Sequence, residues 1–107
     1  MVRTKAFKVV LKEKKGFQRL LKGLPRTSGM KSGQMILASG EDVGEHDTGG
    51  REEILIVLEG EATVLSGSRG RIIAASYSIV YIPAHTAHNV LNLSKSRLRY
   101  IYVVSPV

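Results

Sequence analysis

The second half of the chain is a series of short apolar runs separated by turn residues. The runs are Glu53–Leu58, Glu61–Leu65, Arg71–Ala74, Ile79–Ile82, Ala87–Leu93 and Leu98–Val104. Runs of about four to eight residues bounded by Gly, Pro, Asn and Ser predict β-strands. Ser66–Gly70 has the composition of a hairpin loop, and Pro83, which cannot donate to a ladder, belongs at a strand end. About eight to ten short strands and no convincing helix after Gly33 predict an all-β barrel or jelly roll.

The first third of the chain has a mixed pattern. The predicted features are a strand over Lys5–Leu11, a strand or helical turn over Phe17–Leu21, turns over Pro25–Gly33, a strand over Gln34–Ala38 and an acidic turn over Gly40–Gly44. A chain of 107 residues holds one domain. Within it we expect residues 1–33, the basic segment and first strands, to pack on a barrel core formed by residues 34–107.

Charge is distributed unevenly along the sequence. Up to Gly40 there are ten Lys and Arg against a single acid, Glu13, whereas from Glu41 onward there are six Lys and Arg against eight acids. The basic character therefore belongs to the N-terminal segment, which could contact nucleic acid or an acidic membrane. The segment lacks zinc-finger spacing, interleaved aromatic residues and a helix-turn-helix pattern. We therefore expect a solvated face with no nucleic-acid or membrane partner.

The run Glu53–Leu58 is apolar on both faces. Alternate residues of a strand point to opposite sides, so Leu55 and Val57 face one way with Glu53, while Ile54 and Ile56 face the other way. One face belongs to the core, and the second needs a cover. A second copy of the chain in a homodimer is the economical cover, and an N-terminal strand folding over this face is the alternative.

Neither cysteine nor a long apolar stretch occurs in the sequence. The absence of cysteine excludes disulfides, thiolate metal ligands and a cysteine nucleophile. No run approaches the roughly 20 apolar residues of a membrane span, and the basic start of the chain is not followed by the apolar region of a signal peptide. We therefore expect a cytoplasmic protein.

Three histidines and one glutamate carry the chemistry of the sequence. His46, His85 and His88 are the only histidines, and Glu53 lies seven positions after His46. Imidazole nitrogens and a carboxylate brought together on a rigid sheet are ligands of a divalent transition metal. A carboxylate at the position of Glu53 faces an apolar interior, where it would be costly without a partner that a metal could supply.

The spacing of these residues resembles a known pair of motifs. The first segment runs Gly40, five residues, His46, one residue, Thr48, four residues, Glu53, six residues, Gly60, and the second runs Pro83, one residue, His85, two residues, His88, three residues, Asn92. Both resemble the signature motifs of the cupin superfamily. The resemblance implies a jelly-roll β-barrel and a single metal bound by His46, Glu53 and His88.

Three positions depart from the family pattern. Thr48 stands where the family has a second histidine, His85 stands where it has a glycine, and Tyr77-Ser78 replaces a glycine-containing turn. A hydroxyl is a poor ligand, although Thr48 could hydrogen-bond a metal-bound water. His85 is either a replacement ligand or a loop residue in the left-handed conformation, which histidine adopts more often than most residues.

Several other polar residues are candidates for the surroundings of the site. Asn92 is a strand-end turn former or a hydrogen-bonding partner of the site, and Tyr81 is a core or barrel-mouth residue. Arg51 is a surface residue or the binding group for an anionic substrate. Glu52 is expected to face away from Glu53 and into solvent.

Together these features predict a small metal-binding cupin with an open coordination position for a small-molecule ligand or substrate. Zinc, manganese, iron, nickel and copper all suit the ligand set. If the protein is an enzyme, its chemistry is metal-dependent, for example that of an oxygenase or isomerase. The alternative is a non-enzymatic binding or sensor barrel without a functional metal centre, which the loss of the histidine at position 48 favours.

Overall fold

The structure, a computed structural model, describes residues 4–67 and 70–107, and this part of the chain contains β-strands and no helix. The strands are β1 (Gly16–Lys22), β2 (Lys31–Leu37), β3 (His46–Asp47), β4 (Arg51–Glu59), β5 (Glu61–Ser66), β6 (Arg71–Ala75), β7 (Ile79–Ile82), β8 (Ala87–Leu91) and β9 (Leu98–Pro106). The all-β prediction is confirmed. Residues 1–3 of the predicted N-terminal segment, and Ser68 and Arg69 of the predicted hairpin loop, lie outside the described residues. Nowhere in the described ranges is there a helix long and apolar enough to cross a membrane.

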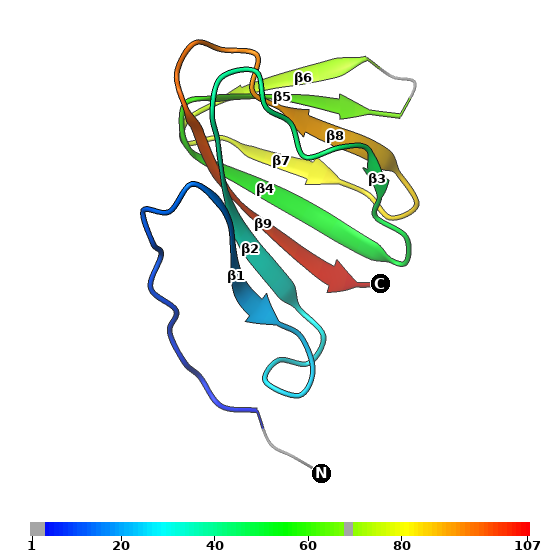
Figure 1. Cartoon of the computed structure of the whole chain (residues 1–107). Helices are drawn as coiled ribbons and strands as arrows, with labels where there is room; N and C mark the ends of the chain where they lie inside the picture. Colours follow the sequence, from blue (N-terminus) through cyan, green and yellow to red (C-terminus); the bar gives the residue numbers. More distant parts are fainter. Residues whose placement is uncertain (1–3, 68–69) are drawn as a thin grey trace.

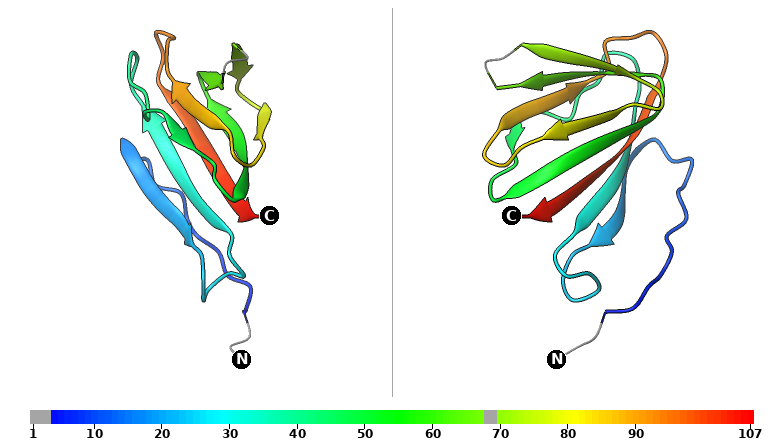
Figure 2. Two further views of the ribbon diagram at one scale, coloured as in Figure 1. Left: turned by 90° about the vertical axis from the view of Figure 1, so that its right-hand side faces the viewer. Right: turned by 180° about the vertical axis from the view of Figure 1, so that it is seen from behind.

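The strands form two antiparallel sheets that face each other (Figures 1 and 2). One sheet has the order β1-β2-β9-β4-β7, and the other has the order β3-β8-β5-β6. Apolar side chains from both sheets fill the space between them. The buried core consists of Leu37, Leu55, Val57, Ala62, Val64, Ala74, Val80, Ile82, Val90, Leu98 and Tyr100.

Strand β4 shows how the sequence pattern positions the site. Glu53 and Leu55 are buried on its inner face, whereas Ile54 and Ile56 are half-buried on its outer face, as the alternation predicts. The strand ends at a tight turn in which Gly60 has a φ of 84°. A Cβ atom at this glycine would collide with the backbone carbonyl of Arg97. This turn therefore requires glycine, and it directs the chain from one sheet into the other.

The predicted strand over Lys5–Leu11 is wrong. Residues 4–15 form no ladder and run as an extended segment across the outer side of β1 and β2, a segment that we call the strap (Figure 1). Side chains take the place of ladder hydrogen bonds. Gln18 accepts from the Lys12 amide (2.8 Å) and donates to the Val10 carbonyl (3.0 Å), and Gln34 donates to the Lys12 carbonyl (2.8 Å). The Phe17–Leu21 run, by contrast, is a strand.

Glu13, the only acid among the first 40 residues, anchors the strap to the sheet. Glu13 pairs with Arg97 (2.8 Å) and with Arg99 (2.9 Å), both of which belong to the far end of the sequence. Arg97 also pairs with Glu59 (2.7 Å). These contacts lie largely on the surface, where ion pairs contribute little individually, but together they fix the C-terminal end of the strap.

Candidate metal centre

His46 and His88 are opposite one another on neighbouring strands. They are Cα partners in the antiparallel pair β3–β8, so their side chains point to the same side of that sheet. Glu53 approaches from the other sheet, on the inner face of β4, beside Ile82 and Val104. The site therefore bridges the two layers of the fold.

The three side chains converge on a single point. One potential ligand atom from each of His46, Glu53 and His88 lies within 4.8 Å of the others. The two imidazole rings are 4.1 Å apart between centroids and are tilted by 59°. His88 and Glu53 are buried, whereas His46 is exposed at the mouth of the site. One metal ion could reach all three groups.

Backbone carbonyls select which ring nitrogen of each histidine is free. The Nδ1 of His46 lies 3.1 Å from the Gly44 carbonyl, and the Nδ1 of His88 lies 3.0 Å from the Thr86 carbonyl. A carbonyl accepts only from a protonated nitrogen, so Nδ1 carries the proton in both neutral rings. Each Nε2 is then left with its lone pair, which is the form that binds a metal.

The Nε2 atom of His88 fits a metal ligand. It is buried, and in the described part of the structure it makes no hydrogen bond. The nearest oxygen of Glu53 is 3.1 Å away, close enough for an ion pair if the ring becomes protonated. A buried polar atom without a partner is costly, and a shared cation would satisfy both this nitrogen and the carboxylate.

Without a cation, the carboxylate changes the protonation of His88. Burial acts to lower the pKa of His88, but the Glu53 carboxylate, the Thr86 carbonyl and Asp47 outweigh burial and raise it. The site thus favours positive charge at the Nε2 atom of His88, and either a proton or a metal can provide that charge.

A cavity of about 540 Å³ is lined by two of the three candidate ligands, His46 and Glu53. Its walls are mostly apolar and aromatic, and they include Phe17, Met35, Tyr100 and Tyr102. Burial raises the pKa values of the Tyr100 and Tyr102 hydroxyls, and the Glu53 carboxylate adds to this shift. Both phenols therefore stay protonated around neutral pH. The volume lies in the range of small-molecule pockets.

Thr48 forms hydrogen bonds to the backbone of the loop next to the site. Its buried hydroxyl donates to the Pro83 carbonyl (2.7 Å) and accepts from the Thr86 amide (3.0 Å). These bonds tie the end of β3 to the loop that precedes β8, and they occupy the hydroxyl both as a donor and as an acceptor. The carbonyl that orients His88 belongs to the same Thr86.

His85, the alternative ligand, lies apart from the other three. It has a φ of 55°, the left-handed conformation, and its side chain is exposed. Its amide donates to the Gly49 carbonyl (2.9 Å), which holds the loop in place. Of the two expectations for this residue, the structure shows the loop conformation.

Two predicted surrounding residues are located elsewhere, and a third lines the cavity. The prediction that Tyr81 is a core or barrel-mouth residue is wrong. Tyr81 pairs with Ile54 and therefore lies on the outer face of the sheet, where its hydroxyl donates to Glu52 (2.9 Å). Asn92 is fully buried and organises the loop before β9 through the Leu37 and Ser96 carbonyls. Arg51 lines the cavity mouth, and its side chain is exposed.

Sequence reasoning missed the groups that orient the ligands and shape the cavity. The Gly44 and Thr86 carbonyls carry no signal in the sequence because every residue has a carbonyl. Phe17 and Met35 could have been found if Phe17–Leu21 had been assigned as a strand, because their pairing puts both on the inner face with Tyr100.

A comparison with protein families identifies one match over most of the chain. The model of the family described as "Cupin domain" matches residues 33–104. This range includes all three convergent side chains and excludes the strap. Among curated proteins, none matches this chain.

Solved structures with the same fold come from bacteria and from an archaeon and a yeast. A Cupin 2 conserved barrel domain protein from Salinispora arenicola is 21% identical with a TM-score of 0.78, and covers 96% of this chain and 92% of its own. An RmlC-like cupin with a double-stranded β-helix fold from Methanocaldococcus jannaschii is 19% identical with a TM-score of 0.76. The match covers 98% of this chain and 94% of the archaeal chain. At these identities the likeness is one of fold alone.

The cupin domain of Schizosaccharomyces pombe Cnp3 is 15% identical with a TM-score of 0.76, and the match covers 85% of this chain. This chain spans 64% of the yeast chain, which is less than two thirds of its length.

Proposed function

Because this chain belongs to the cupin family, we propose that it is a small metal-binding cupin. In this proposal His46, Glu53 and His88 hold one divalent transition metal, and the neighbouring cavity holds a small-molecule ligand or substrate. The geometry brings the three side chains within reach of one ion, which supports the assignment.

The state of the two imidazoles is the observation that carries the proposal. Both Nδ1 atoms are engaged by backbone carbonyls, and the buried Nε2 of His88 has no hydrogen bond in the described structure. A purely structural histidine would use both nitrogens or expose one to water. Here the free nitrogen is directed toward a carboxylate that carries the opposite charge to a metal.

Three protein ligands leave coordination positions for another molecule. Two imidazoles and one carboxylate suit zinc, manganese, iron, nickel and copper. When bound, such a metal would supply a Lewis acid to a molecule in the cavity. The chain contributes apolar side chains to the cavity wall and two protonated phenols, Tyr100 and Tyr102, that can donate hydrogen bonds.

A non-enzymatic binding barrel is the second candidate. Its support comes from Thr48, whose hydroxyl is committed to Pro83 and Thr86, and from the exposure of His46. A site with one exposed and two buried ligands holds a metal less firmly than one with four. The cavity would then bind a small molecule without a metal-dependent reaction.

Elemental mass spectrometry of the purified protein distinguishes the two candidates. We expect near-stoichiometric metal in the wild-type protein and its loss in His46→Ala, which removes an exposed ligand with little effect on the core. Glu52→Ala serves as the matched control, because this neighbouring carboxylate lies on the outer face and should leave the metal content unchanged. Absence of metal after reconstitution would favour the metal-free binding barrel.

A further inference from the structure

An arginine shares the inner face of β4 with the candidate ligand Glu53. Arg51 precedes Glu53 by two residues, and alternate residues of a strand point to the same side, so both side chains line the same cavity. The side chain of Arg51 is exposed, and in the described ranges no carboxylate lies within ion-pairing distance of its guanidinium. This guanidinium is therefore available to an anion that enters the cavity.

The three carboxylates that line the cavity already have other roles. Asp42 and Asp47 each accept a hydrogen bond from the backbone amide two residues further on, at 2.7 Å and 2.6 Å. Glu53 is a candidate metal ligand, and a divalent cation held at the site would offset its charge. An anion in the metal-loaded cavity would thus find its positive partner in Arg51.

An aromatic surface forms another part of the cavity wall. The rings of Phe17 and Tyr102 are nearly parallel, with centroids 6.4 Å apart and planes inclined by 17°. A Cβ atom at Gly33 would come within 2.6 Å of both rings, so glycine at this position gives the two rings room to lie over the strand. Both rings line the cavity, and a flat apolar ligand can stack on them.

Strand geometry limits the length of a ligand that contacts both the arginine and the rings. Tyr102 pairs with Leu55, which lies four residues beyond Arg51 on β4. Four residues span about 13 Å of strand, and the long arginine side chain covers part of this distance. The remaining gap suits a carboxylate joined to a ring by a short aliphatic chain.

We propose that the cavity binds an arylalkyl carboxylate, with its carboxylate on Arg51 and its ring on Phe17 and Tyr102. Arginine suits this role because its planar guanidinium binds a carboxylate through two parallel hydrogen bonds. The inference rests on the proposed function, because this ligand occupies the cavity beside the metal. It adds the chemical class of the ligand and the side chains that recognise its two ends.

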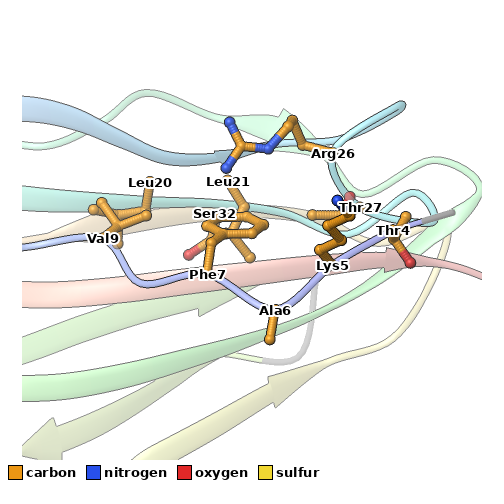
Figure 3. A pocket seen from close by; sticks show the side chains of 10 residues that line it. All are labelled: Thr4, Lys5, Ala6, Phe7, Val9, Leu20, Leu21, Arg26, Thr27 and Ser32. Atoms are coloured by element: carbon orange, nitrogen blue, oxygen red, sulfur yellow. The ribbon is translucent and has the colours of Figure 1, made fainter. Parts of the chain in front are cut away.

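A second hollow, between the strap and the outer side of β1 and β2, provides a comparison (Figure 3). It is also lined by apolar and basic side chains, among them Phe7, Leu20 and Arg26. The guanidinium of Arg26 lies over the ring of Phe7, 4.3 Å from its centroid, and is engaged there. Arg26 is exposed, as Arg51 is, but it belongs to this other hollow, so it supplies the matched control.

Isothermal titration calorimetry of the full chain with phenylpropionate tests the proposal. We expect Arg51→Gln to weaken binding at least about 10-fold, because it removes a charged hydrogen-bonding partner, and Arg26→Gln to leave binding unchanged. The wild type should bind phenylpropionamide, the uncharged analogue, at least about 10-fold more weakly than the acid. No binding of the acid, equal affinity for acid and amide, or an equal loss in both variants would overturn the proposal.

A substitution at Phe17 tests the aromatic end of the site. The Phe17 side chain is exposed by 43%, so Phe17→Leu should leave the fold intact. We expect this variant to bind phenylpropionate several-fold more weakly and to bind cyclohexylpropionate about as well as the wild type does, because a saturated ring cannot stack through a π face. An equal loss for both acids would contradict the stacking.

Elemental mass spectrometry of the same samples separates this inference from the proposed function. Metal-loaded protein that binds the acid equally well with and without Arg51 would overturn the ligand assignment alone. Metal-free protein that still needs Arg51 to bind the acid would overturn the metal assignment and support the ligand class.

Discussion

The Nε2 nitrogen of His88 lies 3.1 Å from a carboxylate oxygen of Glu53, although the two residues belong to opposite sheets. Among the described residues this nitrogen has no hydrogen-bond partner, and the contact brings it next to a buried carboxylate across the middle of the fold. Their approach, together with the nearby His46, creates a place that favours a cation. The same approach makes the site sensitive to anything that moves one sheet relative to the other.

Metal binding should raise thermal stability, because a metal that binds only the folded chain shifts the unfolding equilibrium. At a free metal concentration of 100 times Kd the gain is about 2.7 kcal/mol, which for a chain of this size corresponds to a Tm increase of roughly 10–20 °C. Differential scanning fluorimetry with each divalent metal measures this shift. His46→Ala should abolish the shift and Glu52→Gln should keep it. An equal shift in both variants would place the metal elsewhere.

Replacing Thr48 by valine should destabilise the fold without removing the metal. The Pro83 carbonyl and the Thr86 amide would lose their partner, at a cost of about 1–3 kcal/mol. Urea denaturation reports the free energy of unfolding, and elemental analysis reports the metal content. Thr48→Ser, which retains the hydroxyl, is the control. Loss of metal from a folded Thr48→Val protein would show that the hydroxyl takes part in ligation.

An alanine at position 60 should be poorly tolerated. Gly60 has a φ of 84°, and a Cβ atom there would meet the Arg97 carbonyl. We expect a loss of about 2 kcal/mol or more in the free energy of unfolding, measured by chemical denaturation. Gly50 has open space around its Cβ direction, so Gly50→Ala should leave stability unchanged or slightly higher. Equal stability of the two variants would contradict the backbone assignment of the β4–β5 turn.

Releasing Glu13 should loosen the strap while leaving the sheets intact. Glu13→Gln removes the charge that holds the strap to Arg97 and Arg99. Limited proteolysis with trypsin should then cleave at the strap lysines several-fold faster, because cleavage requires local opening. Glu61→Gln alters an exposed acid on the other sheet and should leave the rate unchanged. No change in rate for Glu13→Gln would show that the strap is held by other contacts.

The contribution of the Arg97–Glu59 pair to the stability of the fold should decrease as the pH falls. The hydrogen bond from Arg97 lowers the pKa of Glu59 below its ordinary value of 4.5. A lowered folded-state pKa stabilises the fold above the unfolded pKa, and this stabilisation disappears as the pH falls through the folded pKa. The difference in stability between the wild type and Arg97→Gln, small for a surface pair, should therefore disappear as the pH falls through the lowered pKa of Glu59. A difference that persists after Glu59 is fully protonated would point to packing rather than charge.

Local pattern was enough to predict most of the fold. Alternation in Glu53–Leu58 identified the inner face of β4, and turn residues marked the ends of the later strands, because both signals depend only on neighbours in the sequence. Lys5–Leu11 has the same strand-like composition and forms no ladder. A ladder needs a partner edge in register, and the composition of a segment does not specify one.

The candidate site shows the same division. The types and spacing of His46, Glu53 and His88 were sufficient to predict that they converge. The ring nitrogen each histidine offers is decided by carbonyls at Gly44 and Thr86, and the orientation of Tyr81 is decided by its register with Ile54. Both the free ring nitrogens and the orientation of Tyr81 depend on how the strands pair, which the sequence pattern does not specify.

By itself, then, the sequence determined the class of fold, the family and the three converging side chains, because residue type and periodicity act locally. Only the tertiary structure decided that Thr48 braces a loop, that His85 faces solvent and that the strap forms no ladder. Each of these follows from backbone hydrogen bonds and packing between segments that are distant in the sequence, and such contacts exist only once the two sheets have come together.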